Sequence, residues 1–201
     1  MRKHALALTI AAVALTVSAC NKGNSGNKAP ETQTPQAEKA AGNKTIAAGL
    51  AANSKFMTTA KAAGLDQTLA GPGPYTVFVP DDAAFNSAPA GTFDANPKNR
   101  AQLTSVISNL ILPGTVMVAD IDKAIDAGKG KAVLATVGGG TLTATKDGGK
   151  TVIADSSGHK ATVTQGDEQY TNGVVHHIDA VLMPSKQAGG NAPAVGQKVG
   201  K

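Results

Sequence analysis

The chain has 201 residues, a formal net charge of +5 and only 3% aromatic residues. This length suits one ordinary domain rather than two, once non-globular ends are subtracted. Most of the positive charge lies in those ends, because residues 44–184 hold 11 basic and 12 acidic residues, a net charge of −1. A near-neutral domain with few aromatic rings to stack on bases is not expected to bind nucleic acid.

The first nineteen residues have the pattern of a secretory signal peptide. Arg2 and Lys3 precede an apolar run over residues 5–17, and the small residues Ser18 and Ala19 follow it. Positive start, apolar middle and small-residue end are typical of such a signal, and the run is too short to span a bilayer as a stable helix. We therefore expect residues 1–19 to direct export and then to be removed.

Cys20 is the only cysteine, so an intramolecular disulfide cannot form. The four residues that end at Cys20 read VSAC. They resemble the bacterial lipobox, in which the signal is cleaved before the cysteine and the cysteine is lipidated. The resemblance implies cleavage between Ala19 and Cys20, and anchoring of the mature protein to a membrane through lipid on Cys20, since two lipid chains hold a protein stably.

Asn21, directly after the cysteine, is not the aspartate that commonly retains bacterial lipoproteins at the inner membrane. The resemblance therefore favours the outer membrane, where the organism has one, with the protein on its periplasmic or cell-surface face.

The two segments that flank the predicted domain are not expected to fold. Residues 21–43 contain no aromatic residue and no Val, Ile or Leu. With Cys20 they form a lipidated, disordered tether whose root-mean-square reach is roughly 25 Å. Residues 185–201 are rich in Gly and Ala with scattered Lys, and we interpret them as a disordered tail.

The first half of residues 44–184 is predicted to be helical. A helix typically begins at a capping Asn or Asp, and apolar residues then recur at helical spacing. The predicted helix starts are Asn53, Asp81, Asn96 with Pro97, and Asp120, and the first and last of these helices end near Ala63 and Asp126.

The second half changes to strands. Short runs in which apolar and polar residues alternate, or which are rich in β-branched residues, occur at 133–137, 141–145, 151–154 and 160–164. Turn residues such as Gly138–Gly140 and Asp147–Gly149 separate them. A longer strand over 172–184 closes the domain. The predicted fold class is α+β, with helices in the first half packed against an antiparallel β meander or wedge in the second half.

The closing strand, Asn172–Pro184, reads NGVVHHIDAVLMP and contains two adjacent histidines. Neighbouring strand residues point to opposite faces, so His176 and His177 cannot bind one metal ion without a bulge. His176 lies on the more apolar face and is predicted to be a hydrogen-bonded core residue. His177 could reach Asp179 or a neighbouring strand, which makes it a candidate surface contact that responds to pH.

A second block, Tyr75–Phe85, reads YTVFVPDDAAF: an apolar strand, a proline and a capped turn. Together with NGVVHHIDAVLMP it resembles the two motifs that bound the core of the fasciclin domain, and the resemblance covers about residues 44–184. It implies a structural role for the matching residues, which are Thr76, Phe78, Pro80, Phe85, Pro113, Gly114, Asn172, Gly173, His176, Ile178, Leu182 and Pro184.

One departure limits what the resemblance implies. Where the family often has a Tyr-His pair before the central Pro-Gly, this chain has Asn109 and Leu110 ahead of Ile111 and Leu112. Integrin-type adhesion of animal relatives is linked to that region and is not expected here. The resemblance still implies extracytoplasmic adhesion or protein interaction, with an unknown envelope or cell-surface protein or glycan as partner.

Catalytic chemistry is not indicated. Asp81 with Asp82, and Asp120 with Asp122, stand at predicted helix starts, where aspartate stabilises free N–H groups. His159 lies in a turn without a partner nearby in sequence. The chain has neither GxSxG nor HExxH, and we expect no enzyme activity, metal or cofactor. A carrier or sensor of a small apolar ligand, bound in a cleft between the helices and the sheet, is the second hypothesis.

Overall fold

The computed structural model describes residues 42–184. Ala19, Cys20, nearly all of the predicted tether and the predicted tail lie outside this range. The described helices are α1 (Ile46–Gly49), α2 (Lys55–Ala63), α3 (Asp66–Ala70), α4 (Asp82–Asn86), the 3₁₀ turn η1 (Pro97–Asn99), α5 (Arg100–Asn109) and α6 (Val118–Ala127). The strands are β1 (Tyr75–Pro80), β2 (Ile111–Pro113), β3 (Lys131–Ala135), β4 (Thr141–Asp147), β5 (Lys150–Ala154), β6 (Lys160–Tyr170) and β7 (Gly173–Ile178).

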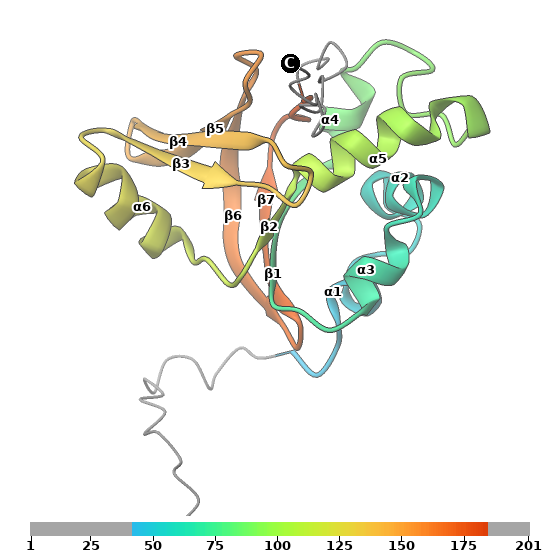
Figure 1. Cartoon of the computed structure of the whole chain (residues 1–201), viewed down its shortest axis with the longest axis horizontal. Coiled ribbons are helices and arrows are strands. Elements are labelled where there is room, and N and C mark those ends of the chain that lie inside the picture. The colour runs from blue at the N-terminus through green and yellow to red at the C-terminus, as the bar shows by residue number, and fades with distance from the viewer. Residues whose placement is uncertain (1–41, 185–201) are drawn as a thin grey trace, which may run out of the picture. The chain divides into compact units, whose positions relative to one another are not determined.

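These strands form one seven-stranded sheet in the order β2-β1-β7-β6-β5-β4-β3. From β3 to β7 each strand pairs antiparallel with the next, which is the predicted meander. Helices α1, α2, α3 and α5 gather on one side, whereas α6 lies apart, beside β3 and β4 (Figure 1). The α+β fold class is confirmed.

The sheet is mixed, because β1 pairs parallel with β7 while β2 pairs antiparallel with β1. The prediction of a purely antiparallel meander missed this parallel pair. The closing strand is also shorter than predicted: β7 ends at Ile178, and residues 179–184 continue without strand pairing. Leu182 nevertheless remains fully buried in the core.

Three helix starts differ from those predicted. Helix α2 is capped by Ser54, whose Oγ accepts from the Met57 amide at 3.3 Å, and not by Asn53. Helix α6 begins at Val118, so Asp120 lies in its first turn and its carboxylate accepts from the Met117 amide. Asn96 caps only the 3₁₀ turn that leads into α5. Ser54 is the residue next to the predicted cap of α2, whereas Asp120 lies within the first turn of α6.

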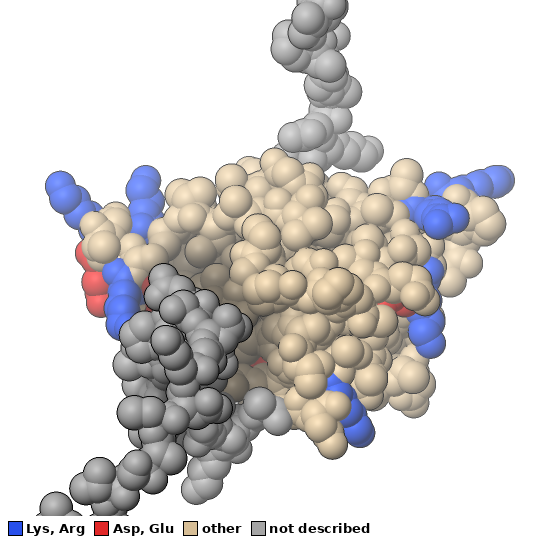
Figure 2. Space-filling view, turned by 60° about the horizontal axis from the view of Figure 1, so that its bottom comes forward, with Lys and Arg blue, Asp and Glu red and all other residues tan. Residues whose placement is uncertain are grey.

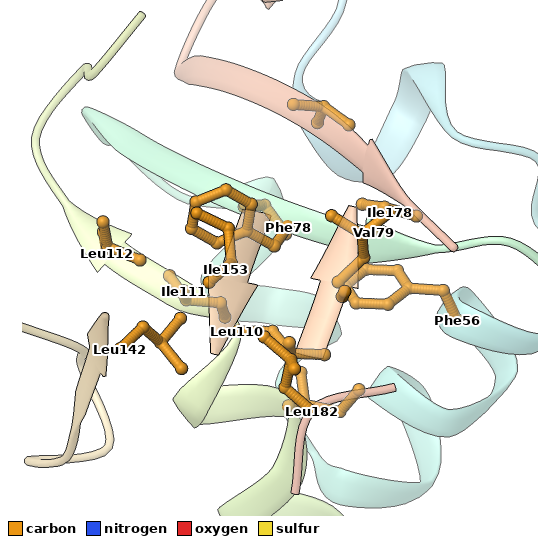
Figure 3. Close-up of a cluster of buried hydrophobic side chains, with 14 of the residues drawn as sticks. Phe56, Phe78, Val79, Leu110, Ile111, Leu112, Leu142, Ile153, Ile178 and Leu182 are labelled. Atoms are coloured by element: carbon orange, nitrogen blue, oxygen red, sulfur yellow. The ribbon is translucent and has the colours of Figure 1, made fainter. Parts of the chain in front are cut away.

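The core fills the space between the helices and the sheet. Phe56 of α2, Phe78 and Val79 of β1 and Ile178 of β7 meet there (Figure 3). Leu110, Ile111, Leu142, Ile153 and Leu182 continue the same cluster toward β4 and β5. Because residues from α2, β1 and β7 share one core, the parallel pair β1–β7 lies at its centre.

Candidate functional site

Asn172 joins three segments through one buried side chain. Its Oδ1 accepts from the Ile46 amide at 2.8 Å, and its Nδ2 donates to the carbonyls of Leu69 at 2.9 Å and Gly71 at 2.8 Å. The residue is 7% exposed, so these bonds replace water for groups that would otherwise be unpaired. Asn172 therefore fixes the start of α1 and the end of α3 against the β6–β7 turn.

Gly173, the next residue, allows the close approach of β1 and β7. A Cβ atom at this position would lie 2.0 Å from the Tyr75 carbonyl oxygen, and the φ angle is +154°. No residue with a side chain fits this contact without displacing the β1 backbone. The Asn-Gly pair predicted as a turn thus also sets the parallel pairing.

Thr76 of β1 is buried and holds the loop that follows β2. Its hydroxyl donates to the Gly114 carbonyl and accepts from the Val116 amide, both at 2.8 Å. Gly114 itself has a left-handed φ of +91°. One threonine side chain therefore fixes the turn after Pro113.

His176 of β7 holds the same loop from the other side. Its Nδ1 accepts from the Asp167 amide at 3.0 Å and its Nε2 donates to the Val116 carbonyl at 2.8 Å, which requires the neutral ring with the proton on Nε2. Burial lowers the pKa of His176, against the opposing effect of the Val116 bond. It is fully buried, so it is the hydrogen-bonded core histidine that the strand pattern predicted.

The other motif residues either line the core or stand at the last position of a strand. Phe78 lies with its ring centroid 5.5 Å from that of His176, and Phe85 packs edge-on against Phe93 at 4.9 Å. Ile178 and Leu182 are fully buried. Pro80 and Pro113 are the last residues of β1 and β2, and Pro184 is the last described residue.

His177 lies on the opposite face of β7, between two carboxylates. Its Nε2 donates to Glu168 of β6 at 3.1 Å, and its Nδ1 is 3.7 Å from Asp81, which follows β1. The histidine therefore reaches neighbouring elements, and Asp179 instead accepts from the Thr162 amide. The His177 side chain is 24% exposed, so it bridges elements at the surface rather than lining a cavity.

Glu168 also accepts from the Tyr170 hydroxyl at 2.6 Å. Burial alone would raise the pKa of Glu168, but the hydrogen bonds from Tyr170 and His177 hold that pKa below its ordinary value. Burial and the Glu168 carboxylate raise the pKa of Tyr170. The ionised Glu168 thus accepts hydrogen bonds from both neighbours, and the bond from His177 joins β6 to β7.

The prediction that His159 lacks a partner nearby in sequence was wrong. Its Nδ1 lies 2.8 Å from Asp155, four residues earlier, and that buried carboxylate also accepts from the amides of Ser157, His159 and Met183. The loop of residues 155–159 folds back on itself, and the spacing of the strands in the sequence does not predict this contact.

The aspartate pairs are used in structure. Asp82 accepts from the Lys55 amide and so caps α2 from the neighbouring helix. Asp122 accepts from the Thr151 hydroxyl at 3.0 Å and pairs with Lys146. Within residues 42–184 no group of three or more His, Cys, Asp or Glu side chains is arranged to hold a metal ion.

Two open hollows mark the surface. One of about 660 Å³ lies beside Phe85 and Phe93, with Lys55 and Asp94 at its edge. The other, of about 1240 Å³, lies between the start of α6 and the β6–β7 hairpin. Neither hollow is an enclosed apolar cavity.

The side of the domain at the bottom of Figure 1 carries few charged side chains across its middle, with Lys and Arg along its margins (Figure 2).

Residues 51–184 match the family model described as the fasciclin domain. The chain belongs to the fasciclin domain family. Protein sll1483 of Synechocystis sp. is 33% identical over 141 residues, which cover 69% of this chain and 71% of that protein. The cell surface glycolipoprotein MPB83 of Mycobacterium bovis is 30% identical over 118 residues, covering 57% of this chain and 46% of that protein.

Among solved structures, a FAS1 domain pair from the insect cell adhesion molecule fasciclin I aligns with a TM-score of 0.61 and 19% identity. The alignment covers 71% of this chain and 52% of that chain, so it extends over about half of the domain pair. At this identity the likeness establishes the fasciclin fold alone. In the part of the chain described by the structure, no helix is both long and apolar enough to cross a membrane.

Sequence reasoning missed the residues that join the fasciclin motifs to the rest of the fold. Asp167 and Glu168 belong to an irregular stretch of β6, where the pairing with β7 shifts between Val163 and Glu168. The signal available was Gly166 followed by two acids. A glycine within a strand run suggests a bulge, whereas the predicted strand stopped at Thr164.

Proposed function

We propose that this chain is an exported, non-enzymatic binding module, anchored to a membrane by lipid on Cys20, whose fasciclin domain mediates cell adhesion or protein interaction. The observation that carries the proposal is the fasciclin match over residues 51–184. A cell surface glycolipoprotein is among the relatives, and an insect cell adhesion molecule shares the fold. The outer membrane is the favoured location, and the partner is an envelope or cell-surface protein or glycan.

The anchor is tested by replacing Cys20 with Ala and separating membranes from soluble proteins. We expect the variant to leave the membrane fraction, because the chain would then lack its lipid. Replacement of Ser25 by Ala, within the polar tether, is the matched control and should leave the protein on membranes. Membrane retention of the Cys20 variant equal to that of the control would contradict the anchor.

Adhesion is tested by crosslinking on intact cells, followed by identification of the attached molecules. Recovery of one cell-surface protein or glycan, together with loss of surface attachment when the gene is deleted, supports the proposal. Attachment that is unchanged by the deletion contradicts it.

The alternative function is a carrier or sensor of a small apolar ligand in the cell envelope. Such carriers enclose an apolar ligand almost completely. The two hollows are instead open, and charged residues such as Lys55, Asp94 and Lys123 border them, which favours the binding module. Native mass spectrometry of the purified protein distinguishes the two, since a bound small molecule of constant mass would favour the carrier.

A further inference from the structure

Asn172 is the one asparagine of the chain that is followed by glycine. In such a pair the backbone nitrogen of the glycine can attack the Cγ atom of the asparagine, because glycine has no side chain to hinder the approach. A bond forms between that nitrogen and Cγ, and the proton of the attacking amide leaves with the side-chain nitrogen as ammonia. Water then opens the resulting imide ring, which leaves either aspartate or isoaspartate in place of asparagine.

The folded protein holds the Asn172 side chain away from this reaction. Its Oδ1 accepts from the Ile46 amide, and its Nδ2 donates to the carbonyls of Leu69 and Gly71. The side chain cannot turn toward the nitrogen of Gly173 without breaking these three hydrogen bonds. At a position that is 7% exposed, water does not replace them.

The backbone of the pair is fixed as well. The Asn172 carbonyl accepts from the Tyr75 amide at 3.0 Å, and a Cβ atom on Gly173 would lie 2.0 Å from the Tyr75 carbonyl oxygen. Ring closure requires rotation about the bond that joins the Cα atom of Asn172 to its carbonyl carbon. That rotation would separate the start of β7 from β1, so the reaction requires that the sheet first open at this point.

Neither product fits the place that Asn172 occupies. Aspartate keeps an acceptor for the Ile46 amide, but it puts a carboxylate oxygen where Nδ2 donates to Leu69 and Gly71, so oxygen then faces oxygen. A buried charge that lacks donors is costly. Isoaspartate adds a methylene group to the backbone and so displaces the following residue from its contact with β1.

We propose that Asn172 is a covalent modification site of the unfolded chain, at which loss of ammonia prevents the chain from regaining the fasciclin fold. Folding protects the site, because the native contacts of Asn172 and Gly173 exclude the geometry of the reaction. The proposal rests neither on adhesion nor on the lipid anchor, since it concerns any chain that stays unfolded. Its failure would leave both untouched.

The first test measures the rate of modification of the purified protein in native buffer and in guanidinium chloride, at the same mildly alkaline pH. Peptide mass spectrometry locates the mass change that accompanies replacement of NH₂ by OH. Modification at Asn172 should be at least about tenfold slower in native buffer, because an ordinary domain is unfolded only a small fraction of the time. Equal rates in the two solutions would overturn the proposal.

Ser54→Gly is the matched control, because it gives the exposed Asn53 a glycine neighbour. Glycine is an acceptable residue at the N-cap of α2, so this variant should fold. In native buffer Asn53 should lose ammonia while Asn172 of the same molecules stays intact. Equal rates at the two positions of the folded variant would also overturn the proposal.

The second test examines the product directly. Asn172→Asp should unfold at a lower urea concentration than Asn172→Ala, which loses the same donors but adds no charge. Asn53→Asp is the control and should unfold with the unmodified protein. An Asn172→Asp chain that does not fold at all, beside a folded Asn53→Asp chain, supports the proposal equally. An Asn172→Asp midpoint at or above that of Asn172→Ala would overturn it.

Discussion

At the scale of single residues, a few buried polar side chains carry the connections between segments that are far apart in sequence. Asn172 bonds to residues before β1, Thr76 bonds to the loop after β2, and His176 bonds to that loop and to β6. Each is a side chain that supplies backbone groups with partners that no helix or strand provides. Removing one of these side chains is costly, because several backbone groups in the interior then lose their hydrogen-bond partner.

Replacing Asn172 with Ala should lower the free energy of unfolding by about 3 kcal/mol, since it leaves the Ile46 amide and two carbonyls unpaired. Urea denaturation followed by circular dichroism measures this. The control is Asn53→Ala, at an exposed position before α2, which should change stability by less than about 0.5 kcal/mol. Equal effects of the two substitutions would contradict the role of Asn172.

The neutral state of His176 predicts a loss of stability in acid. Burial lowers the pKa of His176 in the folded state, so the unfolded chain binds the proton first as the pH falls. The stabilisation from the neutral ring is complete above about pH 6.5 and is lost as the pH falls toward the lowered pKa, at no more than about 1.4 kcal/mol per pH unit.

Urea unfolding at pH 7 and pH 5 tests this. His176→Asn, which does not titrate, should lose less stability than the unmodified protein between these values. The control His177→Gln should keep the acid sensitivity, because it leaves His176 in place. If His176→Asn and the unmodified protein lose equal stability, another group is responsible.

At the scale of elements, β6 and α6 are coupled through Asp167. Its backbone has a left-handed φ of 63°, and its carboxylate accepts from the Val118 amide, the first of α6, at 2.8 Å. The cap of α6 is therefore supplied by β6, which comes much later in the sequence. This explains why Asp120, predicted to be the cap from its position, lies inside the helix.

Replacing Asp167 with Ala should destabilise the domain by about 1 kcal/mol, the usual cost of a lost helix cap. Hydrogen exchange should locate the effect, with faster exchange at the Val118 amide. Asp167→Asn is the control, because its side-chain oxygen can still accept and Asn tolerates the left-handed backbone. Unchanged exchange in the alanine variant would show that Asp167 does not cap α6.

The β1–β7 pair should be sensitive to any side chain at Gly173. Gly173→Ala places a Cβ atom against the Tyr75 carbonyl and should lower Tm by roughly 10 °C. Gly139→Ala is the control in the open β3–β4 turn, where only the positive φ is unfavourable, at a cost of about 1 kcal/mol. If the Gly173 variant had the same Tm as the Gly139 variant, the close contact between Gly173 and Tyr75 would be contradicted.

Local patterns predicted the fold class, the order from helices to meander and the burial of His176. They did not predict the parallel β1–β7 pair, because nothing within Tyr75–Pro80 shows which distant strand will lie beside it. They also placed His177 on a surface without naming its partners, Asp81 and Glu168, since both come from other elements. Hydrophobic period and turn residues report local structure, whereas partners are decided by packing between segments.

At the scale of the whole molecule, charge separates the folded domain from the ends of the chain. Residues 44–184 carry a net charge of −1, while residues 185–201 hold three lysines and no acid. Attraction to an anionic surface is therefore expected from the ends, and recognition of a specific partner from the domain.

Residues 185–201 are removed from a chain that begins at residue 21 and so carries no lipid. This truncation should weaken binding to vesicles that contain anionic lipid at least tenfold at low salt, since each lysine near such a surface contributes about 1 kcal/mol. Vesicle co-sedimentation measures this, and the difference should vanish at 1 M salt, where charges are screened. Neutral vesicles are the control. Binding that is unaffected by the truncation would place the attraction in residues 21–184 and would contradict the role of the tail.

The parallel pairing of the first strand with the last also sets an order of events during synthesis. A chain that emerges amino end first presents β1, with its buried residues Val77 and Phe78, long before Val175 and His176 arrive to lie beside them. Until then the segment cannot complete its native contacts, however long it waits. The domain therefore cannot complete its sheet until its last strand has been synthesised.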